Sequence, residues 1–170
     1  MSTLRRVAVF SFCLCAVAAI ASADPIAPGS WYDFYFYVTA PTQATPSFSF
    51  TSSVPVELRV VDGWAIGDQY SIDVNGSPAF QTSDPSAWDG VATAATDGDT
   101  AWADGRLSHG EIVLSPGTYT IDEFVIRNAS GFTYGEGFIR IDAATPEPGT
   151  LALFGLALTA VIAFRRRRSA

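Results

Sequence analysis

Three residue types that often carry chemistry are scarce in this chain of 170 residues, which has no lysine, one histidine and two cysteines. Both cysteines, Cys13 and Cys15, lie in an apolar stretch near the N-terminus that we expect to be removed as a leader. The remaining chain can then form no disulfide and offers no thiol nucleophile or thiolate ligand. A zinc site needs several histidine or cysteine ligands, and His109 is the only such residue that would remain, so a zinc site is excluded. The sequence therefore predicts no cysteine chemistry and no zinc.

Positive charge is also scarce outside the two ends of the chain. Residues 24–144 hold four arginines against 16 of the 17 acidic residues, which gives a net charge of −12. Phosphate attraction dominates binding to nucleic acids, and here it becomes repulsion. We therefore expect no nucleic acid partner, and an acidic polysaccharide would be repelled unless divalent cations bridged the charges.

The N-terminus has the three parts of a secretory signal peptide. Arg5 and Arg6 precede the apolar run Val7–Ile20, which is followed by Ala21-Ser22-Ala23. A charged region, an apolar region and an A-x-A site in this order predict cleavage between Ala23 and Asp24. Residues 1–23 are thus a predicted signal peptide, and residues 24–144 a predicted exported domain.

The C-terminus is a second tripartite segment, residues 145–170. Pro146 and Pro148 flank Glu147 and favour an extended backbone there. Residues 151–164 carry no charge, and an apolar helix over about 149–164 is shorter than the roughly 20 residues of a full membrane span. It would need bilayer thinning or arginine side chains that reach the headgroups. The run that follows is costly to translocate and predicts a cytoplasmic stop-transfer signal made of Arg165, Arg166, Arg167 and Arg168.

This tail resembles the PEP-CTERM domain, the sorting signal of exosortase substrates in Gram-negative bacteria. The resemblance implies that an exosortase is the partner and that Pro146, Glu147 and Pro148 are its recognition residues, with Glu147 central. It further implies inner-membrane anchoring first, then processing near the motif and delivery to the cell surface or the extracellular matrix. From the residues alone, an ordinary single-pass tail anchor is the alternative.

The exported domain shows the patterns of β-structure. Val54, Val56, Leu58 and Val60 alternate with polar residues, as in a half-buried strand. Asn75-Gly76 is typical of a type I′ hairpin turn. Further strands are expected at 30–39, 47–51, 70–74, 111–114, 118–126 and 137–142, and no stretch shows a helical period. Seven or eight short strands predict an all-β antiparallel sandwich, either jelly-roll-like or immunoglobulin-like.

A long irregular region over residues 81–110 is the predicted binding region if the domain has one. Asp97, Asp99 and Asp104 lie close in sequence and could supply oxygen ligands to calcium, although the EF-hand spacing fails. Four tryptophans could form a platform that stacks on sugars: Trp31, Trp64, Trp88 and Trp102. A surface module that binds exopolysaccharide or calcium through this loop is therefore the alternative function.

No catalytic constellation is evident. Ser108 and His109 are adjacent and cannot face each other as nucleophile and base, and no G-x-S-x-G motif is present. Asp122 and Glu123 should point to opposite faces of a strand. The pattern V-x-D-G-x-x-x-G-D-x-Y, from Val60 to Tyr70, resembles exported β-domains that precede PEP-CTERM tails, which implies a fold more than an activity. We therefore predict no catalytic residues, no enzymatic activity and no cofactor.

Overall fold

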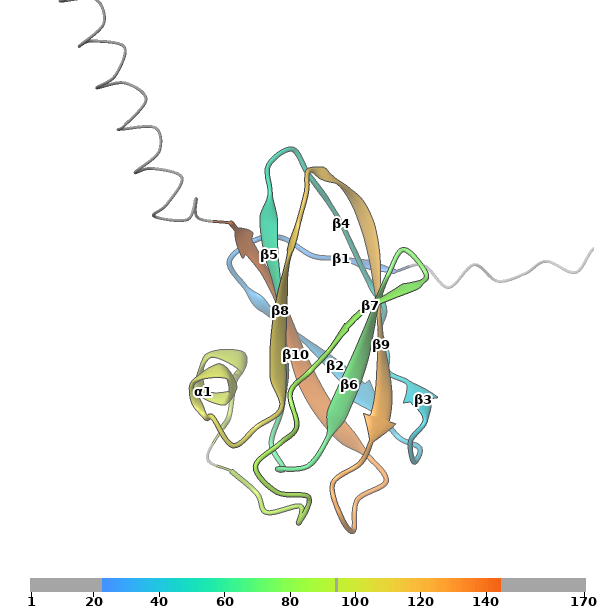
Figure 1. Ribbon diagram of the computed structural model, residues 1–170, viewed down its shortest axis with the longest axis vertical. Coiled ribbons are helices and arrows are strands. Elements are labelled where there is room, and N and C mark those ends of the chain that lie inside the picture. The colour runs from blue at the N-terminus through green and yellow to red at the C-terminus, as the bar shows by residue number, and fades with distance from the viewer. Residues whose placement is uncertain (1–22, 94, 145–170) are drawn as a thin grey trace, which may run out of the picture.

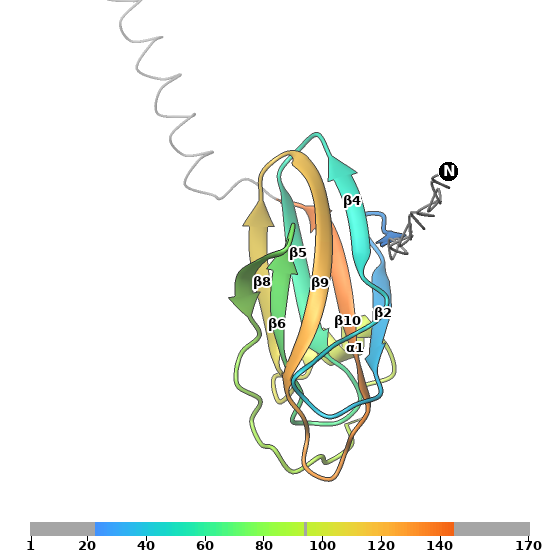
Figure 2. The same cartoon turned by 90° about the vertical axis from the view of Figure 1, so that its right-hand side faces the viewer.

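Two β-sheets packed face to face form the domain in the computed structural model, which describes residues 23–93 and 95–144 (Figures 1 and 2). The first sheet contains, in order, β1 (Asp24–Pro25), β4 (Phe48–Ser52), β9 (Gly117–Arg127), β6 (Gln69–Val74) and β7 (Ser77–Gln81), with β3 (Thr42–Gln43) also paired to β9. The second contains β2 (Trp31–Phe36), β10 (Gly135–Ala143), β5 (Val56–Asp62) and β8 (His109–Leu114). The predicted all-β sandwich is confirmed.

The eight strands of five or more residues pair as a nested hairpin. β6 pairs with β7, β5 with β8, β4 with β9 and β2 with β10, so that each earlier strand meets a later one. Wrapping such a hairpin over two sheets gives the strand order of a jelly roll. All pairs are antiparallel except β1 with β4, which is parallel. The predicted turn Ser115-Pro116-Gly117 connects β8 of the four-stranded sheet to β9 of the first sheet, so it joins strands of different sheets.

Alternating apolar residues build the core, as the sequence predicts, except at Val54, which precedes β5 and is 51% exposed. Phe48 and Phe50 of β4 are buried on one face, and so are Val56, Leu58 and Val60 of β5. Each such side chain contributes about 1.5–3 kcal/mol on burial. The hairpin turn is also confirmed, because Asn75 and Gly76 have φ of 53° and 74°.

One short helix lies in the region that the sequence predicts to be irregular. Helix α1 (Gly98–Ala103) interrupts the region 81–110, with Asp97 and Thr100 forming a capping box at its start. Ala101 and Leu107 pack with Val61 and Phe138 in a second cluster on the outer face of the four-stranded sheet. Six residues are too few for a period of 3.6 to show in the sequence, so packing rather than pattern defines this helix.

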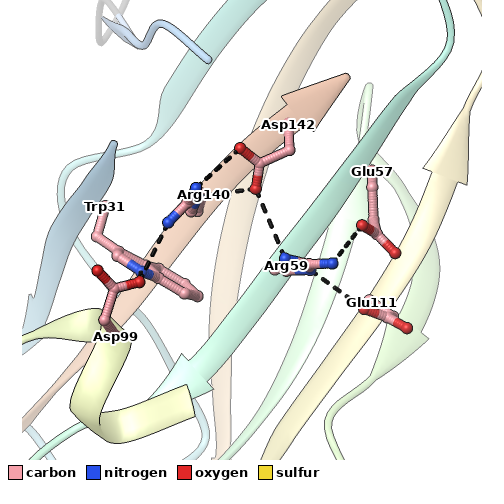
Figure 3. Close-up of polar contacts among 7 residues, drawn as sticks. All are labelled: Trp31, Glu57, Arg59, Asp99, Glu111, Arg140 and Asp142. Atoms are coloured by element: carbon pink, nitrogen blue, oxygen red, sulfur yellow. Dashed lines mark hydrogen bonds and ion pairs between the residues drawn. The ribbon is translucent and has the colours of Figure 1, made fainter. Parts of the chain in front are cut away.

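Two arginines organise the exposed part of the same outer face (Figure 3). Arg59 pairs with Glu57, Glu111 and Asp142, and Arg140 lies 2.7 Å from Asp142. A second nitrogen of Arg140 lies 3.1 Å from Asp99 of α1, whose carboxylate also accepts a hydrogen bond from Trp31 Nε1 at 2.7 Å. The network ties α1 to β2 and β10 and partly compensates the negative charge of the domain.

Glu123 is an unexpected member of the sandwich interior. Its side chain is fully buried on β9, and neither carboxyl oxygen has a hydrogen-bond partner among the described residues. Burial raises its pKa well above the usual value for a glutamic acid. Asp122 points the opposite way and accepts a hydrogen bond from Ser47, so the two acids lie on opposite faces as predicted.

We predict that Glu123→Gln stabilises the protein increasingly as pH rises. Above about pH 4 the unfolded chain ionises this carboxyl while the folded protein keeps its proton, so each further pH unit lowers the stability of the wild type by about 1.4 kcal/mol until the folded pKa is reached. The difference in thermal midpoint between the variant and the wild type should therefore grow as the pH is raised from about 4 until the folded-state pKa is reached. Glu123→Met should show the same growth. A difference independent of pH would contradict the prediction.

Candidate functional site

A pocket of about 420 Å³ lies at one end of the sandwich, where β2 ends, β10 begins and the β5–β6 connection passes between the sheets. These loops gather at the lower end of the domain in Figure 1. Four aromatic and two acidic side chains line it, and we call it the aromatic–acidic pocket: Tyr35, Tyr37, Trp64, Tyr134, Asp68 and Glu136.

Strand geometry places the first of these side chains. On β2, Phe34 and Phe36 point into the core, so Tyr35 between them points outward. Tyr35 is paired in register with Glu136 of β10, which puts both side chains on the outer face of the four-stranded sheet. The neighbouring Gly135 has no side chain, and a Cβ there would collide with the Asp68 carboxyl and the Phe36 ring.

The aromatic walls are unusually open for large side chains. Tyr37 is 73%, Tyr134 53% and Trp64 42% exposed. Trp64 is nevertheless held in place, because Phe132 packs edge-on against it at 5.7 Å and against Tyr134 at 5.8 Å. The walls of the pocket therefore combine exposed ring faces with fixed ring positions.

The two carboxyl groups are held in surroundings that favour their neutral forms. Asp68 is 2% exposed, and its Oδ1 accepts a hydrogen bond from Ala129 N at 2.8 Å. Burial raises the pKa of Asp68 to about 7. The pKa of Glu136 is also raised, first by burial and then by the negative charge of Asp33. Burial and the nearby Asp33, to which the Tyr35 hydroxyl donates at 3.1 Å, raise the pKa of Tyr35.

Behind the pocket, Tyr70 joins the two sheets. Its hydroxyl lies 3.0 Å from the Glu136 carbonyl oxygen and 3.4 Å from Asp62 Oδ1. Burial, together with the charge of Asp68, raises the pKa of Asp62 well above its usual value. Gly67 has φ of 134°, and a Cβ there would come within 2.7 Å of the Ala129 backbone. The segment from Val60 to Tyr70 thus forms the tight connection between the two sheets, and the same segment contributes to the floor of the pocket.

A second pocket of about 450 Å³ adjoins the first. The two share Tyr35 and Glu136, and the second extends over Trp31, Asp33 and Phe138 toward the start of α1. The outer face of β2 and β10 therefore carries two adjacent concave regions, both lined by aromatic and acidic residues.

The structure does not bring the predicted calcium ligands together. Asp97 caps α1, Asp99 binds Trp31 and Arg140, and Asp104 forms two hydrogen bonds with the Arg106 guanidinium. Within residues 23–93 and 95–144, no group of three or more histidine, cysteine, aspartate or glutamate side chains is arranged to hold a metal ion.

The four tryptophans do not form one platform. The Arg127 guanidinium covers Trp88 at 3.4 Å from the ring centre, and Trp102 packs against Trp31 and His109. Trp64 alone of the four lines the aromatic–acidic pocket, beside three tyrosines that composition did not single out. The pocket thus lies outside the irregular region 81–110.

Ser108 and His109 do not face each other. The buried Ser108 hydroxyl lies 2.5 Å from Thr82 Oγ1 and also donates to the Ser83 carbonyl, while His109 Nδ1 is 3.0 Å from the Leu107 carbonyl oxygen. Both side chains are engaged with other partners, so neither is placed as nucleophile or base for the other.

Several predicted sites lie outside the described residues: Ala21 of the cleavage site, the motif Pro146, Glu147 and Pro148, the apolar segment 149–164, and Arg165–Arg168. Asp24, on the other side of the predicted cleavage, begins the domain as the first residue of β1. In the part of the chain that the structure describes, no helix has the length and apolar character needed to cross a membrane.

Comparison with known proteins identifies the tail. The described residues form a β-sandwich domain, and residues 144–168 match the PEP-CTERM protein-sorting motif. The match covers the tail alone, so the chain carries a PEP-CTERM sorting motif behind the sandwich. The motif implies export and exosortase-dependent sorting to the cell surface.

Other comparisons are distant. No curated protein sequence matches the chain. Among solved structures, the pre-peptidase C-terminal domain of collagenase from Bacillus anthracis aligns with 11% identity and a TM-score of 0.43, over 71% of this chain and 95% of that one.

We predict that Asp68→Asn stabilises the protein above pH 4 and that the gain levels off above about pH 7. Raising the pKa from 3.8 to about 7 means that the folded state opposes ionisation by about 4 kcal/mol at neutral pH. An asparagine oxygen can still accept the hydrogen bond from Ala129. Thermal unfolding between pH 4 and pH 9 measures the effect. A gain already complete at pH 4 would contradict the assignment to this carboxyl.

Proposed function

We propose that this protein is a non-catalytic cargo of the exosortase pathway. After export, the exosortase recognises Pro146, Glu147 and Pro148, cuts the chain near the motif and releases the sandwich to the cell surface or the extracellular matrix. Before cutting, the segment 149–164 and Arg165–Arg168 anchor the chain in the inner membrane. The proposal includes no cofactor.

The observation that carries this proposal is the position of the sorting motif relative to the domain. The motif begins at residue 144, and β10, the last strand of the described chain, ends at Ala143. β10 lies between β2 and β5 and is indispensable to its sheet, whereas a cut near Pro148 leaves all ten described strands intact. The domain can therefore be released folded.

The placement of the candidate catalytic residues agrees with an exported domain that has no catalytic site. Ser108 and His109 are bound to local partners, and Asp122 and Glu123 lie on opposite sides of β9. These placements support the proposal that the domain has no activity of its own.

A second candidate function, binding of extracellular polysaccharide, is favoured by the aromatic–acidic pocket. Ligand sites are typically concave and lined by aromatic side chains with a few polar groups, and this pocket has both features. It replaces the 81–110 loop as the expected place of contact.

We predict that the mature protein from its native host ends near Pro148. Mass spectrometry of the intact protein should show loss of the residues that follow, including Arg165–Ala170. Glu147→Ala should retain the tail, because the central recognition residue is removed. Thr145→Val, which places at this position the residue common in the family, is the matched control and should be processed normally. An intact C-terminus in the wild type would overturn the proposed processing and leave a plain membrane anchor.

A further inference from the structure

The aromatic–acidic pocket offers ring faces that no part of the described chain covers. Tyr37, Trp64 and Tyr134 are all more than two-fifths exposed, although large aromatic side chains are among those most stabilised by burial. The pocket volume of about 420 Å³ falls in the range of about 300–1,000 Å³ that is common for small-molecule sites. A pyranose ring, with one face of C–H groups, is a suitable partner for such walls.

The floor of the pocket contains carboxyl oxygens that can accept hydrogen bonds, and no positively charged side chain of the described residues lines the pocket. Asp68 is almost completely buried, and only one of its carboxyl oxygens, Oδ1, has a hydrogen-bond donor among the described residues. The Glu136 carboxyl likewise lies in the lining and makes no hydrogen bond to the described residues, and no arginine or histidine contributes to the lining. Burial disfavours the charged forms of these two carboxyl groups when no cation is present. An ammonium group that enters the pocket compensates this cost, because it pairs with the ionised carboxylate as the carboxyl proton is released to solvent and is also attracted by the aromatic rings.

The charge of the whole domain acts in the same direction. Residues 24–144 carry −12, so the long-range field attracts a polycation and repels an anionic polysaccharide. Charge complementarity therefore favours an amine-bearing polymer over a neutral or acidic one.

We propose that the aromatic–acidic pocket binds an amine-bearing sugar unit of an extracellular polysaccharide, with the sugar ring against Trp64 and the ammonium group at Asp68 and Glu136. This inference rests on the second candidate function given above and names its ligand. The second pocket shares Tyr35 and Glu136 with the first, so further units of the same polymer lie over Trp31 and Asp33.

The position of the pocket suits this role. Gly135 and Glu136 open β10, whereas Ala143 closes it, about 26 Å away along the strand. In Figure 1 the arrowhead of β10 lies in the upper part of the sandwich, away from the loops at its lower end. A domain held through its C-terminus thus keeps the pocket away from its attachment.

The test compares two oligosaccharides of equal length, one of glucosamine and one of N-acetylglucosamine, by calorimetric titration of the full chain at a pH where the amines are charged. The glucosamine oligomer should bind about tenfold tighter or more, because its ammonium groups gain charge-assisted hydrogen bonds. Glu136→Gln should abolish most of this preference. Asp73→Asn on β6, which removes the same charge outside the lining, is the matched control and should leave the preference unchanged.

A third variant tests the aromatic wall. Trp64→Ala should weaken the binding of both oligomers. Tyr37→Ser repeats the test at a side chain so exposed that folding does not depend on it. Equal affinity for both oligomers, with Glu136→Gln behaving as the wild type, would overturn the amine inference while polysaccharide binding stands. If neither oligomer binds, both the amine inference and the proposed polysaccharide binding are overturned.

Discussion

The contact made by Tyr70 is the one on which both the sandwich and its pocket depend. The ring, fully buried on β6, packs edge-on against Phe34 of the opposite sheet at 5.0 Å. Because a buried phenol needs a hydrogen-bond partner, its hydroxyl meets the Glu136 carbonyl oxygen and fixes the start of β10 relative to β6. The same hydroxyl lies 3.4 Å from Asp62 Oδ1, and Asp68 and Glu136 both line the pocket. Tyr70 thus contributes both to the packing of the core and to the position of the strand that contributes to the floor of the pocket.

The sorting motif and the aromatic–acidic pocket lie at the two ends of one strand, β10. The sorting motif starts where β10 ends, and the aromatic–acidic pocket lies where β10 begins. β10, which lies between β2 and β5, therefore separates the sorting motif from the pocket. Removing the tail does not alter the hydrogen bonds that β10 makes with β2 and β5.

Much of the fold was predictable because its signals are local. Alternation in β4 and β5 and the positive-φ pair Asn75-Gly76 follow from neighbouring residues alone. Helix α1 was missed because six residues carry no periodic signal and its stability comes from packing on Val61 and Phe138. Glu123 was also missed as a core residue, since an acid in a strand normally indicates the solvent face.

The sequence by itself determined the sorting motif, the absence of cysteine from the exported domain, its net charge and its β-class, because each depends on composition or on residues close together in the chain. Only the tertiary structure decided which residues form the candidate site. Tyr35, Trp64, Asp68 and Glu136 come from three separate segments, and the pairing of β2 with β10 and the crossing at Gly67 bring them together. Such long-range pairings follow from packing two sheets, for which no local pattern in the sequence exists.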